Sequence, residues 1–432
     1  MKQSRFTTCI QLHNGYTIIY NALNDKFIVS NSINLNLRGN QITGSADKLT
    51  RQLSEAGVLL DDGVDEVKLL ADLFERIDNN DSEYHIHINP TLNCNFRCWY
   101  CYEEHQPASR MQDTVLQAVL KLLATTVERN CELKVLYLSF FGGEPLLYYQ
   151  DIALPIIRHA QDICAKRGVE LQLHFTTNGY FLSRKVLDSL KGIDTSFQIT
   201  VDGGREFHDK TRFCINGKGS YHRIMSNIKE AAKDNNVIFR INYTAENLKS
   251  VYDVLEDMAD IDKEAKKNIS VDLQRVWQDL DSDNDIENEV SHICSLFRNK
   301  DFSCHTHYMR GAPGSSCYGD KRNNVLINYN GDVFFCTARD FKREDRAGYL
   351  DADGQIVWEN NALERRMAVK FSRDECRNCR IAPICGGGCR QRAMERINRE
   401  GCLLDYSEEN KTDIVLRRFE QFFVKTESDG DL

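Results

Sequence analysis

The sequence predicts an α/β protein centred on a partial (β/α)6 barrel, with a small winged-helix-like α+β unit before it and a cysteine-rich domain after it. Three observations support this prediction. A strong hairpin signal opens the chain, strand and helix patterns alternate regularly after Tyr84, and cysteines crowd together beyond residue 302. A chain of 432 residues is long enough for two or three domains. We place the domain limits at 1–80, 81–301 and 302–412, followed by a C-terminal helix and tail over 413–432.

The first unit begins with the predicted hairpin. Two apolar runs, Thr7–Leu12 and Tyr16–Tyr20, are joined through Asn14-Gly15, a pair typical of two-residue β-turns. A third apolar run at Phe27–Val29 extends the sheet. Two helical patterns follow, one capped by Ser45 and one over Val64–Ile77.

Six strand–helix units come next. Such alternation requires a mainly parallel sheet with helices outside it, and active sites in these barrels lie at the carboxyl ends of the strands. The predicted strands are Tyr84–Ile88, Leu133–Phe141, Leu171–Thr176, Ser196–Val201, Val237–Tyr243 and Ile269–Val276. The predicted helices are Asp113–Val127, Ile152–Lys166, Ser183–Leu190, Tyr221–Asp234, Ser250–Ile261 and Ile286–Asn299.

Composition narrows the class of function. A net charge of −9 and the lack of a basic patch with interleaved aromatic residues argue against nucleic-acid binding. The N-terminus has no apolar signal segment and no apolar run is long enough to cross a bilayer, so we expect a cytoplasmic protein with no membrane partner. Sixteen cysteines in that compartment favour metal ligation over disulfides, because cytosolic thiols stay reduced.

The loop after the first barrel strand carries three cysteines, Cys94, Cys98 and Cys101, within eight residues. A cubane 4Fe–4S cluster normally takes four cysteine ligands, so a three-cysteine loop leaves one iron open to a ligand that is not protein. A zinc site is the alternative. Structural zinc needs four ligands, usually two separated cysteine pairs, and no second pair lies nearby. The spacing therefore favours an iron–sulfur cluster with an open iron.

Polar motifs follow the next three strands. Gly142-Gly143-Glu144-Pro145 follows the second strand, where glycines allow close backbone approach to a ligand and Glu144 supplies a carboxylate. Thr176-Thr177-Asn178-Gly179 follows the third strand, with short polar groups suited to a ribose or a carboxylate. The fourth strand ends in Thr200-Val201-Asp202, and Arg212 comes shortly after. Each motif alone is typical of a turn or a surface charge, but their joint placement indicates a ligand site.

This arrangement resembles the radical S-adenosylmethionine (SAM) enzymes, whose signature is cysteine, three residues, cysteine, two residues, cysteine. Tyr100 stands where the family has an aromatic residue, and Thr200 where it has a serine. The resemblance implies that the open iron binds SAM, which the reduced cluster cleaves to a 5′-deoxyadenosyl radical. It also implies that Glu144 binds the methionine ammonium and Arg212 its carboxylate. The residues expected at SAM are Tyr100, Gly142, Gly143, Glu144, Pro145, Thr177, Asn178, Thr200, Asp202 and Arg212.

A second cysteine pattern lies beyond residue 302. It begins at Cys317 and continues after thirteen residues with Gly331 and after four more with Cys336. The Asn330-Gly331 pair predicts a hairpin turn between Asn324–Tyr329 and Asp332–Phe335. The pattern ends with Cys376, Cys379, Cys385, Cys389 and Cys402. These seven cysteines resemble the SPASM domain, which holds auxiliary 4Fe–4S clusters in a subset of radical SAM enzymes.

The resemblance implies two auxiliary clusters, and three clusters in all. One auxiliary cluster takes Cys376, Cys379, Cys385 and Cys402, and the other takes Cys317, Cys336 and Cys389. The fourth ligand of the second group stays open. Cys304, flanked by His305 and His307, is one candidate, and without it the iron is free to bind a substrate thiolate. A zinc module of cysteine pairs is the alternative for this domain.

Enzymes with a SPASM domain mostly modify peptides and proteins. Sulfatase maturases carry an aspartate general base where this chain has Thr337, directly after Cys336. Asp340 comes three residues later and is the candidate base, but a salt-bridged loop residue beside Arg339 and Arg343 is the favoured explanation. We therefore rank a maturase that forms a thioether or carbon–carbon cross-link in a ribosomal precursor peptide above one that oxidises a Cys or Ser in a protein, as sulfatase maturases do.

The expected partners are the peptide or protein substrate and an external one-electron reductant of the flavodoxin or ferredoxin type. The first unit either grips the leader of the precursor by adding a strand to its sheet or only packs on the barrel. An electron-transfer protein without radical chemistry is the alternative of another class. Such a protein needs neither Gly-Gly-Glu-Pro nor polar groups at successive strand ends, and both are present.

Overall fold

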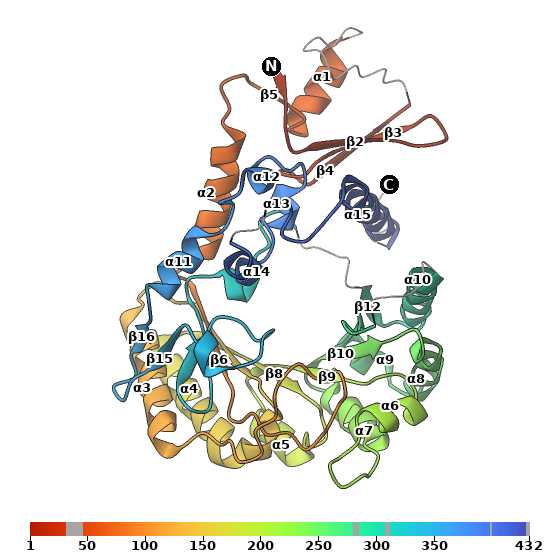
Figure 1. The fold of residues 1–432 in the computed structure, drawn as a ribbon. Helices are drawn as coiled ribbons and strands as arrows, with labels where there is room; N and C mark the ends of the chain where they lie inside the picture. The colour runs from red at the N-terminus through yellow and green to blue at the C-terminus, as the bar shows by residue number, and fades with distance from the viewer. Residues whose placement is uncertain (32–45, 280–284, 307–311, 398–399, 429–432) are drawn as a thin grey trace. The chain divides into compact units, whose positions relative to one another are not determined.

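The computed structural model describes residues 1–31, 46–279, 285–306, 312–397 and 400–428, which form two compact units (Figure 1). Unit 1 comprises Met1–Asn80, Tyr308–Arg322 and Leu363–Leu432, and unit 2 comprises Asp81–His307 and Asn323–Ala362. This grouping differs from the predicted domain limits. The segment 1–80 shares a unit with the C-terminal part of the chain, and the region 302–412 is divided between the two units.

Unit 2 is built on an eleven-stranded sheet in the order β12-β11-β10-β9-β8-β7-β6-β13-β14-β15-β16. All neighbours from β6 to β12 pair in parallel. The six predicted barrel strands are confirmed, and β12 adds one more parallel strand. They are β6 (Glu83–Ile88), β7 (Val135–Phe140), β8 (Glu170–Thr177), β9 (Asp194–Thr200), β10 (Asn236–Tyr243), β11 (Ile269–Arg275) and β12 (Ser303–Thr306).

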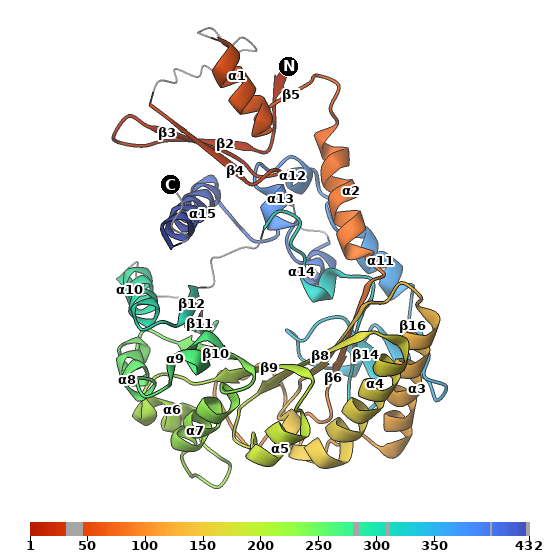
Figure 2. The same cartoon turned by 180° about the vertical axis from the view of Figure 1, so that it is seen from behind.

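The helices of unit 2 lie on the outer side of this curved sheet (Figures 1 and 2). Their apolar side chains share one core with every second strand residue, for example Leu171, Leu173 and Phe175 of β8. The six predicted helices are confirmed. The helices are α3 (Asp113–Arg129), α4 (Leu154–Arg167), α5 (Arg184–Ser189), α6 (Arg205–Thr211), α7 (Tyr221–Ala231), α8 (Val251–Asp257), α9 (Lys263–Lys267) and α10 (Asp285–Asn299).

The other edge of the parallel set carries a short antiparallel extension. β13 (Asn324–Ile327) pairs in parallel with β6, and β14 (Asp332–Phe334), β15 (Gly348–Leu350) and β16 (Ile356–Trp358) follow in antiparallel order. The predicted hairpin is confirmed, with Gly331 at φ 85° in its turn. Because β6 and β13 run in the same direction, the loops after both strands meet at one end of the sheet.

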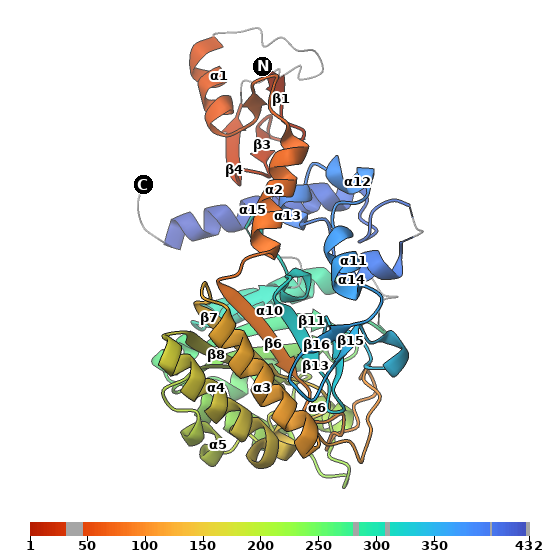
Figure 3. The same cartoon turned by 90° about the vertical axis from the view of Figure 1, so that its left-hand side faces the viewer.

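Unit 1 contains the three-stranded antiparallel sheet expected near the N-terminus (Figure 3). The hairpin at Asn14-Gly15 is confirmed, with Gly15 at φ 82°. Asp65 caps α2 by accepting the Lys68 N–H at 3.0 Å. Ser45, the expected cap of α1, lies outside the described residues. The elements are β1 (Lys2–Gln3), β2 (Thr7–Gln11), β3 (Thr17–Asn21), β4 (Lys26–Ser30), α1 (Ala46–Glu55), β5 (Leu59–Leu60) and α2 (Glu66–Asp78).

Short helices from the end of the chain complete unit 1. Phe6, Tyr20 and Phe74 share a core with Ile384 and Val415, so the first and last parts of the chain bury apolar surface against each other. The helices are α11 (Ala362–Ala368), α12 (Asp374–Arg377), α13 (Ala382–Cys385), α14 (Arg390–Glu395) and α15 (Glu408–Ser428), the last containing the amphipathic stretch expected at 413–423. Across the described ranges, no helix has the length and apolar character to span a membrane.

Candidate functional site

The loop after β6 places the three predicted ligands at the carboxyl end of the sheet. The Cys94 side chain is buried, Cys98 is partly buried and Cys101 is exposed. The Phe96 N–H donates to Cys94 Sγ at 3.4 Å, and the Ile215 N–H donates to the Asn95 carbonyl at 2.9 Å. The loop therefore runs from the core to the surface with its first thiol anchored.

The three thiols are not thiolates by themselves. Burial raises the pKa of Cys94 to about 12, and the carboxylate of Glu144 acts in the same direction. Burial and then Glu103 raise the pKa of Cys101 to about 11, and burial also raises that of Cys98. A group that binds here must supply positive charge to stabilise the thiolates, as iron ions do. This donor set of three soft sulfur ligands fits the predicted cluster.

The glycine pair after β7 packs directly under the cysteine loop. Gly142 has φ 78° and Gly143 φ 34°, and a Cβ on Gly143 would lie 2.2 Å from the Asn93 carbonyl oxygen. The Glu144 N–H donates to that same carbonyl at 2.9 Å. The close approach that the glycines allow is thus to the backbone of the cysteine loop itself.

Glu144 joins the ends of two strands. Its fully buried carboxylate accepts the Leu146 N–H at 2.9 Å and the Thr177 hydroxyl at 2.7 Å through Oε1, and the Asn178 N–H at 2.8 Å through Oε2. Pro145 begins the short 3-10 helix Pro145–Tyr148 that Glu144 caps. The carboxylate therefore fixes the turns after β7 and β8 in place, and its contact with the SAM ammonium stays a prediction.

Tyr100 lies at the centre of a buried polar network. Its hydroxyl donates to Asp202 Oδ2 at 2.5 Å and accepts from Arg212 Nη1 at 2.6 Å and Asn242 Nδ2 at 3.2 Å. Burial raises the pKa of Asp202 to about 6, against the lowering effect of Arg212. Arg212 Nε and Asp202 Oδ1 are buried without a hydrogen-bond partner among the described residues. The network thus brings together three residues predicted at SAM and leaves polar groups that fit a ligand.

The remaining predicted contacts lie at the same end of the sheet. Thr177 ends β8 and Thr200 ends β9, and both side chains are buried. Asn178 follows Thr177, and its Nδ2 lies 3.8 Å from Cys94 Sγ. The structure brings these residues into two hydrogen-bonded sets beside the cysteine loop, one joining Tyr100 and Arg212 and the other joining Glu144, Thr177 and Asn178. Their roles toward SAM stay predictions.

Sequence reasoning missed two residues of the loop. Glu103 Oε2 accepts the Gly143 N–H at 2.8 Å, and burial raises its pKa to about 7. His105 Nε2 lies 3.6 Å from Cys101 Sγ. Both follow the cysteine motif directly, so their closeness to Cys101 in the sequence could have singled them out. Their carboxyl and imidazole groups contact the glycine turn and the Cys101 thiol.

Asp340, the candidate base, is held by its own loop and by the cysteine loop. Its Oδ1 accepts the Glu104 N–H at 3.2 Å and the Phe341 N–H at 3.0 Å, and Oδ2 lies 3.8 Å from Lys342 Nζ. Asp340 thus forms an ion pair with Lys342, and the sequence places Arg339 and Arg343 beside it as well. The carboxylate thus anchors one loop to the other, and its role as a base stays a prediction.

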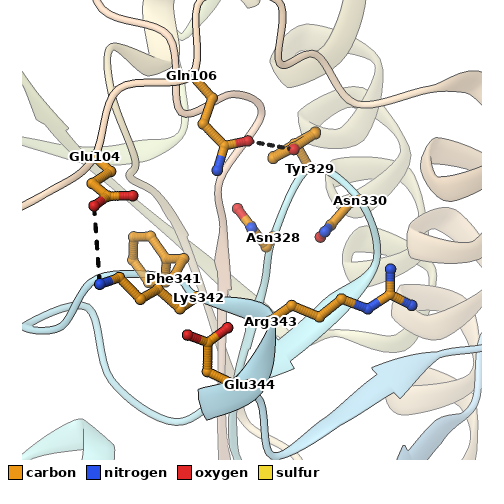
Figure 4. Close-up of a pocket in the computed structure, with 9 residues that line it drawn as sticks. All are labelled: Glu104, Gln106, Asn328, Tyr329, Asn330, Phe341, Lys342, Arg343 and Glu344. Carbon is orange, nitrogen blue, oxygen red and sulfur yellow. Dashed lines mark hydrogen bonds and ion pairs between the residues drawn. The ribbon is translucent and has the colours of Figure 1, made fainter.

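A polar pocket of about 450 Å³ lies beside this junction (Figure 4). The Tyr329 hydroxyl donates to Gln106 Oε1 at 2.7 Å across it, and Lys342 lies 3.9 Å from the Glu104 carboxylate. Its walls come from the loops after β6 and β13 and from 341–344. The lining residues are Glu104, Gln106, Asn328, Tyr329, Asn330, Phe341, Lys342, Arg343 and Glu344.

Unit 1 contains a separate cavity lined by four of the predicted auxiliary ligands. Its volume is about 210 Å³, and Cys376, Cys379, Cys385 and Cys402 all line it. Burial, and then the neighbouring thiols of Cys385, Cys402 and Cys379, raise the pKa of Cys376 to about 11. The four thiols have the donor chemistry of a closed four-ligand cluster, although no three His, Cys, Asp or Glu side chains in the described residues are already arranged to hold a metal ion. The ligand assignment stays a prediction.

The other predicted auxiliary ligands are divided between the units. Cys317 and Cys389 belong to unit 1 and Cys336 to unit 2, so their grouping stays a prediction. The Ala338 N–H donates to Cys336 Sγ at 3.3 Å. Cys304, in β12, is buried in the unit 2 core, which also contains Cys294. In this position Cys304 is a core residue. The side chain of His305 and the whole of His307 lie outside the described residues.

Comparisons with known proteins agree with this geometry. Residues 88–258 match the family model described as the radical SAM superfamily. The chain is 26% identical over 375 residues to the cysteine-type anaerobic sulfatase-maturating enzyme of Clostridium novyi, covering 77% of this chain and 92% of that protein.

Two solved structures share the fold. Native anSMEcpe with bound AdoMet and Cp18Cys peptide matches with a TM-score of 0.57 at 18% identity, over 80% of this chain and 99% of that one. Streptococcus suis SuiB bound to precursor peptide SuiA matches with a TM-score of 0.50 at 11% identity, over 91% of this chain and 97% of that one.

Proposed function

We propose, from the premise that this chain is a radical SAM enzyme, that it matures a ribosomally made precursor peptide by closing a thioether or carbon–carbon cross-link. The observation that carries the proposal is the pair of cysteine sites. The three-thiol loop of unit 2 leaves a coordination position for SAM, and the four-thiol cavity of unit 1 suits an auxiliary cluster.

The residues of unit 2 have defined tasks under this proposal. Cys94, Cys98 and Cys101 would hold the catalytic cluster, and the Tyr100–Asp202–Arg212 network would orient the methionine end of SAM. When bound, cluster and SAM together would supply a 5′-deoxyadenosyl radical that takes one hydrogen atom from the peptide; closing the cross-link would release one further electron, to the auxiliary cluster held in unit 1, and one proton. Glu144 keeps the surrounding turns closed, which excludes water from the site. An external flavodoxin- or ferredoxin-type protein would supply the electron.

Two observations favour cross-linking over oxidation of the sulfatase-maturase type. Thr337 stands where those maturases carry the base, and Asp340 is bonded to two backbone N–H groups of the loops it joins. SuiB, solved with a precursor peptide, also matches a larger share of this chain than anSMEcpe does. The alternative, oxidation of a Cys or Ser in a protein, is favoured by the 26% identity to the maturase of C. novyi.

The N-terminal sheet supports a precursor with a leader. In the described part of the chain, β4 has one ladder neighbour, β3, and Val29 on β4 is 43% exposed. An extended peptide can add to such an edge through main-chain hydrogen bonds. We propose that the leader binds at β4. Val29→Pro, which blocks strand addition, should weaken binding of the peptide encoded beside the gene in a fluorescence anisotropy titration, whereas Val357→Pro on β16 should not.

One experiment tests the function. Anaerobically reconstituted, reduced protein is incubated with SAM and with the peptide encoded by a neighbouring small open reading frame. We expect 5′-deoxyadenosine and a peptide lighter by two hydrogens that gives no aldehyde reaction with a hydrazide. Failure to form 5′-deoxyadenosine contradicts radical chemistry. An aldehyde in a sulfatase-derived Cys or Ser peptide instead supports the alternative.

A further inference from the structure

We propose that Asn178 donates a hydrogen bond to the Cys94 sulfur and thereby raises the reduction potential of the cluster that the loop binds. The inference rests on the proposed function, because it needs Cys94 as a cluster ligand. Asn178 Nδ2 lies 3.8 Å from Cys94 Sγ and donates to Asn95 Oδ1 at 2.8 Å. The sequence suggested a ribose or carboxylate contact for this residue, and the structure turns its amide toward a sulfur instead.

The orientation of this amide is set by its other bonds. Asn178 Oδ1 accepts the Tyr180 N–H at 3.0 Å, and the Asn178 N–H donates to Glu144 Oε2 at 2.8 Å. The side chain is 6% exposed, so water does not compete for these groups. Reversing the amide would leave the Tyr180 N–H unpaired, which is costly for a buried group. Nδ2 is therefore the atom that faces Cys94.

A donor at this sulfur has a defined electrostatic effect. Reduction adds an electron to the cluster, and N–H groups aimed at its sulfur ligands stabilise the more negative state. The Phe96 backbone N–H already approaches Cys94 Sγ at 3.4 Å. Asn178 adds a second donor that comes from a different strand end. Removing this donor should shift the midpoint potential of the cluster to more negative values.

Two variants test the donor. Asn178→Asp keeps the shape of the side chain but replaces its NH2 group with a carboxylate oxygen. Asn95 can turn to donate to this oxygen through Nδ2, which is buried without a partner in the described residues. Asn178→Leu removes the donor without adding a charge. Asn227→Asp is the matched control, because Asn227 Nδ2 holds the same turn through the Gly179 carbonyl at 2.7 Å without reaching a sulfur.

The measurement is an anaerobic redox titration followed by electron paramagnetic resonance, using the cluster signal that changes when SAM is added. Iron content is measured on each sample. We expect both Asn178 variants to bind as much iron as the parent and to have a more negative midpoint potential. Asn227→Asp should have the midpoint potential of the parent. Unchanged potentials in both Asn178 variants overturn the proposal. Loss of iron from this site in both variants assigns Asn178 to cluster assembly and also overturns it.

These outcomes are separate from failure of the proposed function. If the parent forms no 5′-deoxyadenosine, the radical chemistry fails whatever the potential. If the parent forms it and the potentials do not move, the role of Asn178 alone is wrong.

Discussion

The two cysteine sites contained within single units differ in their surroundings. In unit 2, three thiols lie among the buried charged residues Glu144, Asp202 and Arg212, and some of their polar atoms have no partner in the described residues. In unit 1, four thiols line a small cavity whose walls are largely apolar, with Ile381, Leu403 and Leu404 among them. A site with four protein ligands needs no further ligand. A cluster held by three thiols would need one, and buried polar atoms without partners in the described residues lie beside those thiols.

The largest expected effect is on 5′-deoxyadenosine formation, which should depend on the three-thiol site of unit 2 and not on the four-thiol site of unit 1. Cys98→Ala should reduce 5′-deoxyadenosine formation to background, because the remaining thiols cannot hold the cluster that cleaves SAM. Cys402→Ala should lower the iron content by about four atoms per chain while 5′-deoxyadenosine still forms. Iron analysis and chromatography of the nucleoside measure both. If Cys402→Ala also stopped SAM cleavage at normal unit 2 iron content, the two sites would not be independent.

Buried charge in unit 1 serves structure rather than a ligand. Asp78 is fully buried and accepts from Arg390 Nη2 at 2.6 Å, Lys370 Nζ at 2.8 Å and Ser316 Oγ at 2.5 Å. Asp78→Ala should destabilise unit 1 by about 3–5 kcal/mol, because Arg390 loses its carboxylate partner in the interior and Lys370 keeps only Asp320, at 3.4 Å. Urea unfolding measures the change.

A matched exposed pair provides the control for Asp78. Asp374 pairs with Arg377 on α12 and is 80% exposed. Asp374→Ala should cost less than about 1 kcal/mol, since solvent screens the pair. Equal effects at the two positions would show that the Asp78 cluster adds no stability beyond that of a surface pair.

The next prediction tests whether the Arg212 side chain in unit 2 contributes to SAM binding. Its guanidinium bonds the Tyr100 hydroxyl at 2.6 Å and retains an unpartnered Nε among the described residues. Arg212→Lys should weaken SAM binding about 10- to 100-fold, because a lysine lacks the planar fork that a carboxylate and a hydroxyl share. Equilibrium dialysis with reconstituted protein measures the dissociation constant. Arg223→Lys, over the Tyr180 ring at 4.1 Å, is the conservative control and should bind SAM like the parent.

The smallest effect distinguishes the units by their response to acid. Burial lowers the pKa of His87 to about 3 and of His174 to about 4, both on the barrel strands of unit 2. Unfolded histidines take up a proton near pH 6.5, and these two stay neutral when folded. Their contribution to stability is therefore full above pH 6.5 and is lost as the pH falls from there toward 4, at about 1.4 kcal/mol per pH unit for each histidine.

Unit 1 contains one histidine, the exposed His13, so its unfolding should lack this acid dependence. His87→Gln should reduce the dependence of the unfolding free energy of unit 2 on pH by the amount that corresponds to uptake of about one proton. Urea unfolding between pH 7.0 and 5.0, with hydrogen exchange to separate the units, measures both slopes. Equal slopes for parent and His87→Gln would contradict a neutral His87 in the folded state.

Much of unit 2 followed from local sequence signals. The period-two and helical patterns that predicted β6 to β11 and six helices, α3, α4, α5, α7, α8 and α10, reflect burial of one side of each element, which the chain encodes residue by residue. The order of motifs after successive strands also placed Tyr100, Glu144, Asn178 and Arg212 near one another, because parallel strands end on the same side of a sheet.

Other features depend on contacts between distant residues. No local pattern indicated that the first eighty residues share a core with α13 and α15, that Cys304 packs against Cys294, or that Glu103 bonds Gly143. Each of these depends on which surfaces meet after the chain has folded.

By itself, the sequence determined which thiols are available, how they are spaced, and which strands bring polar groups to them, since these depend on residue order alone. The tertiary structure decided which atoms those groups face. It turned the Asn178 amide to a sulfur, engaged Glu144 with backbone N–H groups and held Asp340 between two loops. The reason is physical: a buried polar atom takes the partner that packing leaves within hydrogen-bond reach, and that partner is distant in the chain.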